Sequence, residues 1–151
     1  MLARDIMTTN VVTVSPETTV EEVAKLITER GISGVPVVEE NGNLVGIVSE
    51  GDIITRLKNL HIPTYFQLLG GVIYFEGTKK LENDLKKMTA YQVKDLMTKE
   101  VFSVGLEAPV EEIATLMAVK KINRVPVVEG EKLVGIISRA DIVRTLIKSA
   151  E

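Results

Sequence analysis

The chain offers few residues suited to catalysis, and these lack the partners that common mechanisms need. It contains one histidine, His61, and no cysteine, which excludes thiol nucleophiles and thiolate zinc sites. No partner motif surrounds His61, so a hydrolase triad has little support. The paired carboxylates Glu21-Glu22 and Glu111-Glu112 recur on predicted helix faces and indicate solvated charge, and the glycines at 70–71 lack the lysine and spacing of a phosphate-binding loop. We therefore expect no enzymatic activity, no catalytic cofactor and no metal.

Two Ser-x-x-Asp motifs are the remaining polar features with a regular spacing. Ser49 precedes Asp52 by three residues, and Ser138 precedes Asp141 in the same way. Each motif stands where a helix is predicted to begin, so serine at the N-cap and aspartate at the third helical position would form a capping box, which the helix dipole favours. This structural role explains the motif as well as a binding role does, and the two roles are compatible.

Composition narrows the class of protein. Lys and Arg number 18 against 21 Asp and Glu, giving a net charge of −3, so a nucleic-acid partner is not expected. The first residues, MLARDIM, lack the apolar core of a signal peptide, and no apolar run approaches the ~20 residues of a membrane helix. We expect a cytoplasmic protein with no membrane contact.

The chain contains an internal repeat. Residues 4–57 align with residues 94–146 when one gap is placed after Glu39, and roughly half of the aligned positions are identical. Two unrelated segments would share only a few residues, so the sequence has arisen by duplication.

Each repeat carries the same order of local signals, which predicts a β-α-β-β-α unit. A short β-branched run at Thr13-Val14 precedes an amphipathic helix, which Thr18 and Glu21 could cap and whose counterpart has Pro109 in its first turn. Two strands follow, around the turn signal Asn41-Gly42, and then the helix opened by Ser49. The apolar positions of the first helix and of its counterpart are Val20, Val23, Ala24 and Ile27, and Val110, Ile113, Ala114 and Met117.

A unit of this size with a three-stranded sheet buries too little apolar surface to be stable alone. Two units packed through their sheets with pseudo-twofold symmetry would solve this and leave two related clefts. We therefore predict an α+β fold of α/β-like character, with an apolar and partly helical insert between the repeats.

The ordered set DIMT, VPVV, GIVSEGD and its second copy DLMT, VPVV, GIISRAD resembles the CBS domain, which occurs in tandem as a Bateman module. The resemblance covers residues 3–57 and 93–147. It divides the chain into a first CBS motif at 1–60, an insert at 61–91 and a second CBS motif at 92–151.

The resemblance implies binding of an adenosine-containing nucleotide in the clefts between the repeats. Ser49 and Ser138 would face a phosphate at a helix N-terminus, and Asp52 and Asp141 would accept hydrogen bonds from ribose hydroxyls. Arg124 would reach a phosphate, whereas Gly34 could not. One cleft would combine Ser49 and Asp52 with Arg124, and the other Ser138 and Asp141 with Ser33. The further candidate contacts, mainly for adenine, are Thr8, Asn10, Val12, Thr98, Glu100, Phe102 and Asn123.

The insert holds five of the six aromatic residues and is too apolar for a solvated linker. A helix with Leu81, Leu85 and Met88 on one side is expected within it. We expect one of two roles for the insert. Either it packs over its own module, or it forms a homodimer contact or lines the entrance of a cleft. The aromatic residues are Tyr65, Phe66, Tyr74, Phe75 and Tyr91.

The function predicted first is regulatory sensing of AMP, ADP, ATP or S-adenosylmethionine through a shift in conformation. The ligand would act on a homodimer, and an unidentified effector protein would respond, because no effector domain lies in the sequence. The alternative is a structural or protein-interaction CBS module without a bound nucleotide. An undetected enzyme ranks third.

Overall fold

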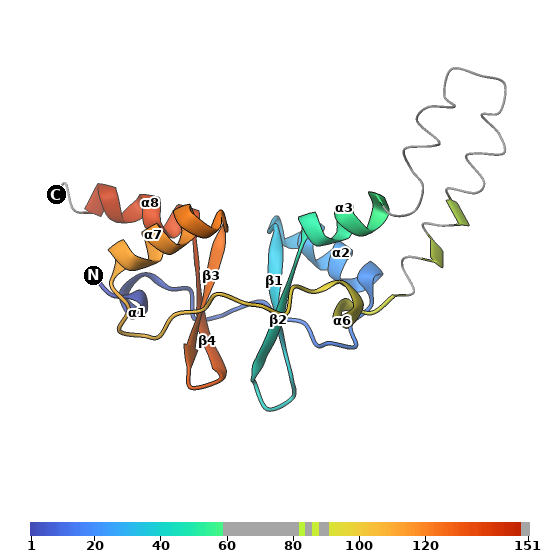
Figure 1. Cartoon of the computed structure of the whole chain (residues 1–151), viewed down its shortest axis with the longest axis horizontal. Helices are drawn as coiled ribbons and strands as arrows, with labels where there is room; N and C mark the ends of the chain where they lie inside the picture. The colour runs from blue at the N-terminus through green and yellow to red at the C-terminus, as the bar shows by residue number, and fades with distance from the viewer. Residues whose placement is uncertain (59–81, 84–85, 88–90, 149–151) are drawn as a thin grey trace, which may run out of the picture. The chain divides into compact units, whose positions relative to one another are not determined.

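The structure, a computed structural model, describes residues 1–58, 82–83, 86–87 and 91–148 (Figure 1). As predicted, the class is mixed α+β, and each repeat contributes a β-hairpin and helices. The first repeat and the segment after the insert contain α1 (Ala3–Ile6), α2 (Val20–Arg30), β1 (Gly34–Val38), β2 (Leu44–Ser49), α3 (Glu50–Lys58) and α6 (Val93–Leu96). The rest of the second repeat contains α7 (Val110–Lys120), β3 (Arg124–Glu129), β4 (Lys132–Ser138) and α8 (Arg139–Lys148).

The chain divides into two compact units that exchange short segments. Unit 1 comprises Met1–Thr13, Val38–Val45 and Glu100–Glu151, and unit 2 comprises Val14–Val37 and Gly46–Lys99. In unit 1, the Ala3 N–H donates to the Ala108 carbonyl at 2.8 Å; in unit 2, the Val93 N–H donates to the Thr18 carbonyl at 2.7 Å. The segment that precedes the first long helix of each repeat therefore packs in the unit that contains most of the other repeat.

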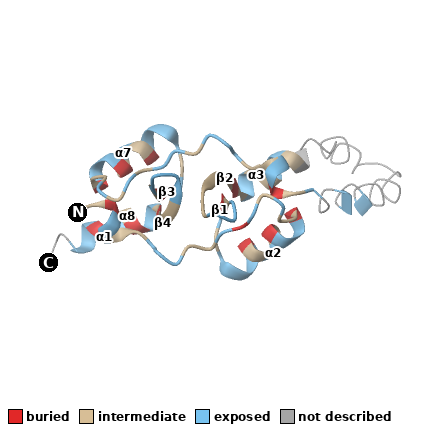
Figure 2. Cartoon of the chain, turned by 90° about the horizontal axis from the view of Figure 1, so that it is seen from below, coloured by how far each residue is buried: buried red, intermediate tan, exposed pale blue. Residues whose placement is uncertain are grey.

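Unit 1 has its core between α7, the β3–β4 hairpin and the N-terminal segment. The hairpin is antiparallel and pairs Arg124 with Ser138, with an irregularity between Val127 and Val128. Figure 2 shows buried positions along the inner side of α7, where Val110, Ile113 and Met117 follow the predicted helical spacing. The buried core cluster consists of Ala3, Ile113, Met117, Val125, Val127 and Ile137.

Unit 2 repeats this arrangement around β1 and β2. Helix α2 buries Val20, Val23 and Ile27, as its apolar spacing predicts, and α3 packs against α2 and α6. Val93 of α6 is fully buried in this unit. The four-residue helices α1 and α6 were not predicted, because one turn is too short to show a period.

The predicted first strand of each repeat is wrong. Val14 makes a single parallel bridge to Val37, Val104 makes one to Val127, and each sheet has two strands instead of three. The Val14 N–H donates to the Pro36 carbonyl at 3.1 Å. To extend this pairing toward the N-terminus, the N–H of residue 36 would have to donate, and to extend it toward the C-terminus, the N–H of residue 16. Both residues are prolines, which have no N–H.

The helix caps also differ from expectation by one residue. The capping box of α2 uses Thr19 and Glu22, with Thr19 N–H to Glu22 Oε2 at 2.9 Å, instead of Thr18 and Glu21. The hydroxyl of Thr18 instead accepts from the Ser15 N–H at 3.1 Å, which closes the preceding turn. Pro109 is the N-cap of α7 and lies just outside its first turn. The predicted Asn41-Gly42 turn is present, and Gly42 has the positive φ of 85° that favours glycine.

Most of the insert lies outside the described residues, including the predicted helix face of Leu81, Leu85 and Met88 and four of its five aromatic residues. Tyr91 is described and is exposed. The Arg56 guanidinium lies 4.9 Å from the centroid of its ring, a cation–π contact within unit 2.

Candidate ligand-binding sites

The first candidate site is built where β2 ends and α3 begins. Asp52 Oδ2 accepts hydrogen bonds from the Ser49 N–H at 2.9 Å and from the Ser49 hydroxyl at 3.1 Å. In return, the Asp52 N–H donates to Ser49 Oγ at 3.4 Å. The predicted capping box is therefore present, and it leaves Asp52 Oδ1 for other partners.

Thr98 supplies the partner of that second oxygen. Its hydroxyl donates to Asp52 Oδ1 at 3.2 Å, and its backbone exchanges two hydrogen bonds with Ile47 at 2.8 and 3.0 Å. Gly46 permits this approach, because a Cβ there would lie 2.6 Å from Met97 Sδ and 3.1 Å from the Thr98 carbonyl oxygen. The Ser-Asp motif of one repeat and a threonine of the other repeat therefore meet within unit 2.

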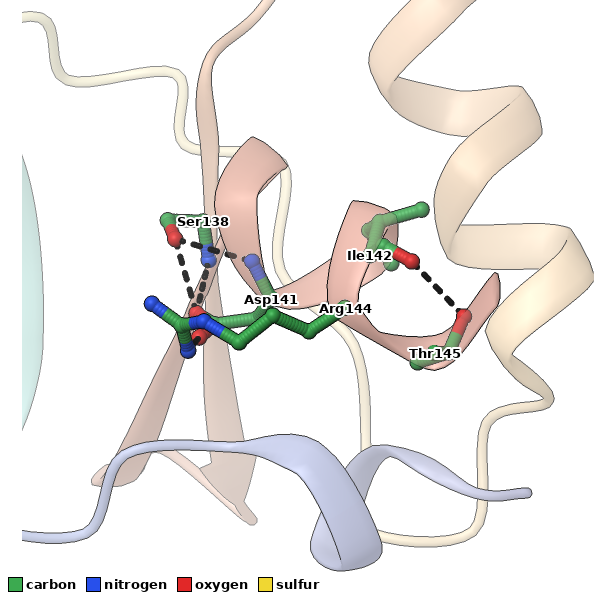
Figure 3. A network of polar contacts seen from close by, with 5 residues as sticks. All are labelled: Ser138, Asp141, Ile142, Arg144 and Thr145. Carbon is green, nitrogen blue, oxygen red and sulfur yellow. Dashed lines mark hydrogen bonds and ion pairs between the residues drawn. The ribbon is translucent and has the colours of Figure 1, made fainter. Parts of the chain in front are cut away.

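The second candidate site has the same frame in unit 1 (Figure 3). Asp141 Oδ2 accepts from the Ser138 N–H at 2.7 Å and from the Ser138 hydroxyl at 2.8 Å. Thr8 exchanges backbone hydrogen bonds with Ile136 at 2.9 and 3.0 Å, and Gly135 leaves room for Met7. The backbone arrangement thus matches that of Ile47, Thr98, Gly46 and Met97.

The two sites differ at the remaining carboxylate oxygen. Asp141 Oδ1 forms an ion pair with Arg144 Nη1 at 2.7 Å, and the Asp141 side chain is only 9% exposed. At the position of Arg144 the first repeat has Thr55, and Asp52 has no ion-pair partner in the described part of the chain. Sequence reasoning missed Arg144, although its spacing of three residues from Asp141 on a helix was a usable signal.

The residues ahead of each Val-Pro-Val strand lie at the helix start of their own repeat. The Ser33 carbonyl accepts from the Glu50 N–H at 2.9 Å, and Gly34 is buried at the start of β1. Asn123 accepts from Arg139 twice, through its backbone carbonyl at 3.1 Å and its side chain at 3.2 Å. Arg124 is the strand partner of Ser138.

The predicted cross-repeat pairs remain predictions, because they join residues of different units. They are Arg124 with Ser49 and Asp52, and Ser33 with Ser138 and Asp141.

The candidate adenine contacts fall in the extended segments that follow Thr8 and Thr98. Asn10 and Glu100 are exposed, and Val12 is half-buried. Phe102 is 41% exposed, and the Lys120 ammonium lies 4.9 Å from its ring centroid. This cation–π contact from the end of α7 was not predicted.

Unit 1 also contains a groove of about 400 Å³ between α7 and α8. Apolar side chains such as Met117 and Ile142 line it together with Lys121, Asn123 and Arg139. Its size suits a small ligand. Asn123 is the one predicted site residue in its lining, and neither Ser138 nor Asp141 contributes to it.

Within residues 1–58, 82–83, 86–87 and 91–148, no three His, Cys, Asp or Glu side chains are grouped so that they could hold a metal ion. No helix in the same residues is long and apolar enough to span a bilayer.

Comparison with known families decides the classification. The model of the CBS domain matches twice, at residues 3–59 and 93–148. The chain belongs to the CBS-domain family. These matches cover both Ser-Asp motifs and both Thr8 and Thr98.

The chain is similar to proteins of archaea and plants. The uncharacterized protein MJ1426 of Methanocaldococcus jannaschii is 34% identical over 97% of this chain and 92% of its own length. The chloroplastic CBS domain-containing protein CBSX1 of Arabidopsis thaliana is 34% identical over 89% of this chain, which spans 58% of that protein. A crystal structure of CBSX2 in complex with AMP has 29% sequence identity and a TM-score of 0.76, and the match covers 99% of this chain and 98% of the chain in that structure.

Proposed function

We propose that this CBS pair is a regulatory module that binds an adenosine-containing nucleotide and performs no chemistry on it. The observation that carries the proposal is the carboxylate of Asp52. It lies half-buried at a helix N-terminus, and Thr98 holds one of its oxygens at 3.2 Å. The likeness to CBSX2 in complex with AMP supports the choice of ligand class.

The chemistry of each Ser-Asp motif suits a nucleoside phosphate. A carboxylate can accept hydrogen bonds from two neighbouring ribose hydroxyls, which are donors. The N-terminal ends of α3 and α8 carry the positive end of the helix dipole, which favours an anion such as a phosphate. Ser49 and Ser138 add a hydroxyl at each helix start.

The remaining predicted residues are assigned to the same sites as part of the proposal. Arg124 is assigned to a phosphate and Phe102 to adenine. The other assigned residues are Thr8, Asn10, Val12, Ser33, Gly34, Thr98, Glu100 and Asn123. Binding would favour one conformation of the module by its differential affinity, and a separate effector protein would respond to the change.

Ligand binding to purified, nucleotide-free protein tests the proposal. AMP, ADP, ATP and S-adenosylmethionine are each titrated by calorimetry and by thermal unfolding. A ligand at 100 times its dissociation constant should add about 2.7 kcal/mol of stability. The double variant Asp52→Ala/Asp141→Ala should lose this gain. If none of the four ligands binds the unaltered chain, the protein is a structural or interaction module instead.

We also propose that the chain forms a homodimer, because its duplicated sheets are small and its insert is rich in aromatic residues. Light scattering at micromolar concentration should give twice the chain mass of 16.6 kDa. A mass of 16.6 kDa under these conditions would contradict a dimer.

A further inference from the structure

The ion pair between Arg144 and Asp141 uses Asp141 Oδ1, the carboxylate oxygen that would otherwise accept from a ribose hydroxyl. Capping uses Asp141 Oδ2, and Arg144 Nη1 holds Oδ1 at 2.7 Å, so both oxygens of this buried carboxylate have donors (Figure 3). At Asp52, the partner of the equivalent Oδ1 among the described residues is the neutral hydroxyl of Thr98, at 3.2 Å. Thr55 stands where Arg144 stands in the other repeat and carries no charge.

This difference changes what each carboxylate can accept. A guanidinium binds a carboxylate more strongly than a hydroxyl does, because the hydrogen bond is charge-assisted. The hydroxyls of an uncharged nucleoside must compete with it for Oδ1. An anionic ligand can instead form the ion pair with the Arg144 guanidinium. Asp141 Oδ1 is then available to the ribose hydroxyls. The Arg144 side chain is 67% exposed, which leaves it free to turn between the two anions.

The geometry points to Arg144 as the residue that makes the Ser138–Asp141 site selective for phosphorylated nucleosides over uncharged ones. This inference rests on the proposed function and assigns different ligand preferences to its two sites. At the Asp52 site the corresponding residue is Thr55, so adenosine meets no competing cation at the carboxylate, and the preference for AMP there depends on Arg124 as proposed above.

The test isolates each site by removing the aspartate of the other. In an Asp52→Ala background, the affinities for AMP and adenosine are measured by calorimetry with and without Arg144→Thr, which introduces the residue of the first repeat. Adenosine should bind about fivefold more tightly once the ion pair, in which only Arg144 is exposed, is gone, and AMP should bind more weakly. The preference for AMP over adenosine should fall at least about tenfold.

The reciprocal exchange is the matched control. In an Asp141→Ala background, Thr55→Arg should raise the preference for AMP at the Asp52 site. Arg144→Gln serves as a second variant that keeps hydrogen-bonding capacity without the charge, and it should behave like Arg144→Thr. Circular dichroism confirms that each variant is folded, and because Arg144 is exposed we expect no loss of structure.

The outcomes separate this inference from the proposed function. An unchanged AMP-to-adenosine ratio in Asp52→Ala/Arg144→Thr and in Asp52→Ala/Arg144→Gln overturns the role of Arg144 and leaves nucleotide binding intact. Binding of AMP by the unaltered chain but not by Asp52→Ala likewise overturns only the assignment to Asp141. A chain that binds neither ligand overturns both.

Discussion

Asp52 and Asp141 each divide their two carboxylate oxygens between different partners. Oδ2 belongs to the capping box in both cases, with Ser49 or Ser138 as the donor. Oδ1 faces Thr98 in one case and Arg144 in the other. Replacing either aspartate by alanine therefore removes the carboxylate half of the capping box, at about 1 kcal/mol, together with the proposed ribose acceptor. Ser49→Ala and Ser138→Ala weaken the cap and remove the proposed phosphate contact while leaving the carboxylate, so their effect on adenosine, which has no phosphate, reports the cap alone.

Thr98→Val should destabilise the protein, whereas Thr8→Val should not. The Thr98 hydroxyl donates to Asp52 Oδ1, while the Thr8 side chain makes no hydrogen bond with any described residue. Because the bond is partly exposed, its loss should lower the free energy of unfolding by about 0.5–1 kcal/mol. Urea unfolding of both variants measures this difference. Equal effects of the two substitutions would contradict a specific role for the Thr98 hydroxyl.

The sequence revealed part of each site. Both Ser-Asp motifs were found, because capping follows from local spacing along a helix. The contact between Thr98 and Asp52 depends on two segments 46 residues apart, and no local pattern specifies it. The choice of Arg144 instead of Thr8 as the partner of Asp141 depends on side-chain conformation, which the spacing permits but does not require.

At the scale of elements, Gly46 and Gly135 fix how closely β2 and β4 approach the segments beside them. A Cβ at Gly135 would lie 2.9 Å from Met7 Cγ and 3.2 Å from Met7 Cβ, and one at Gly46 would lie 2.6 Å from Met97 Sδ. Both strands thus use the absence of a side chain to admit a methionine. Thr8 and Thr98, each the next residue after that methionine, are positioned by the same contact.

Gly46→Ala and Gly135→Ala should each destabilise the protein by about 1–3 kcal/mol, because the added methyl group overpacks a close contact. The Thr98 carbonyl, 3.1 Å from the new Cβ at Gly46, also receives a hydrogen bond from Ile47 and resists displacement. Gly105→Ala is the control, since no atom lies within 4 Å of its added Cβ. Thermal unfolding should rank Gly105→Ala close to the unaltered chain; a similar loss in all three variants would contradict this account.

The long helices and hairpins followed from periodicity and turn residues, whereas the first strands did not form. Val20, Val23 and Ile27 recur at helical spacing and are buried, as are their counterparts on α7. The run at Thr13-Val14 has the composition of a strand, but Pro16 and Pro36 remove the donors that would extend its pairing beyond Val14. Composition predicted the strand, and hydrogen-bonding capacity decided against it.

At the scale of the whole molecule, the two repeats in the sequence and the two compact units of the structure do not consist of the same residues. Unit 2 includes residues up to Lys99, and unit 1 begins with Met1–Thr13. The alignment of the repeats could reveal the duplication but not the exchange, because the exchanged segments resemble each other: DIMT occurs in one and DLMT in the other. Either segment could occupy either position on sequence alone.

The exchange predicts which fragments of the chain can fold. Fragment 14–99 contains every residue of unit 2, whereas fragment 1–60 contains the first repeat but lacks Val93, Met97 and Thr98. Val93 is fully buried, and a buried valine contributes about 1.5–3 kcal/mol, which a unit of this size cannot spare. Fragment 14–99 should show cooperative thermal unfolding by circular dichroism, and fragment 1–60 should not. Adding residues 91–99 to the end of fragment 1–60 through a flexible linker should restore the transition. Cooperative unfolding of fragment 1–60 by itself would show that the repeat, and not the exchanged unit, is what folds.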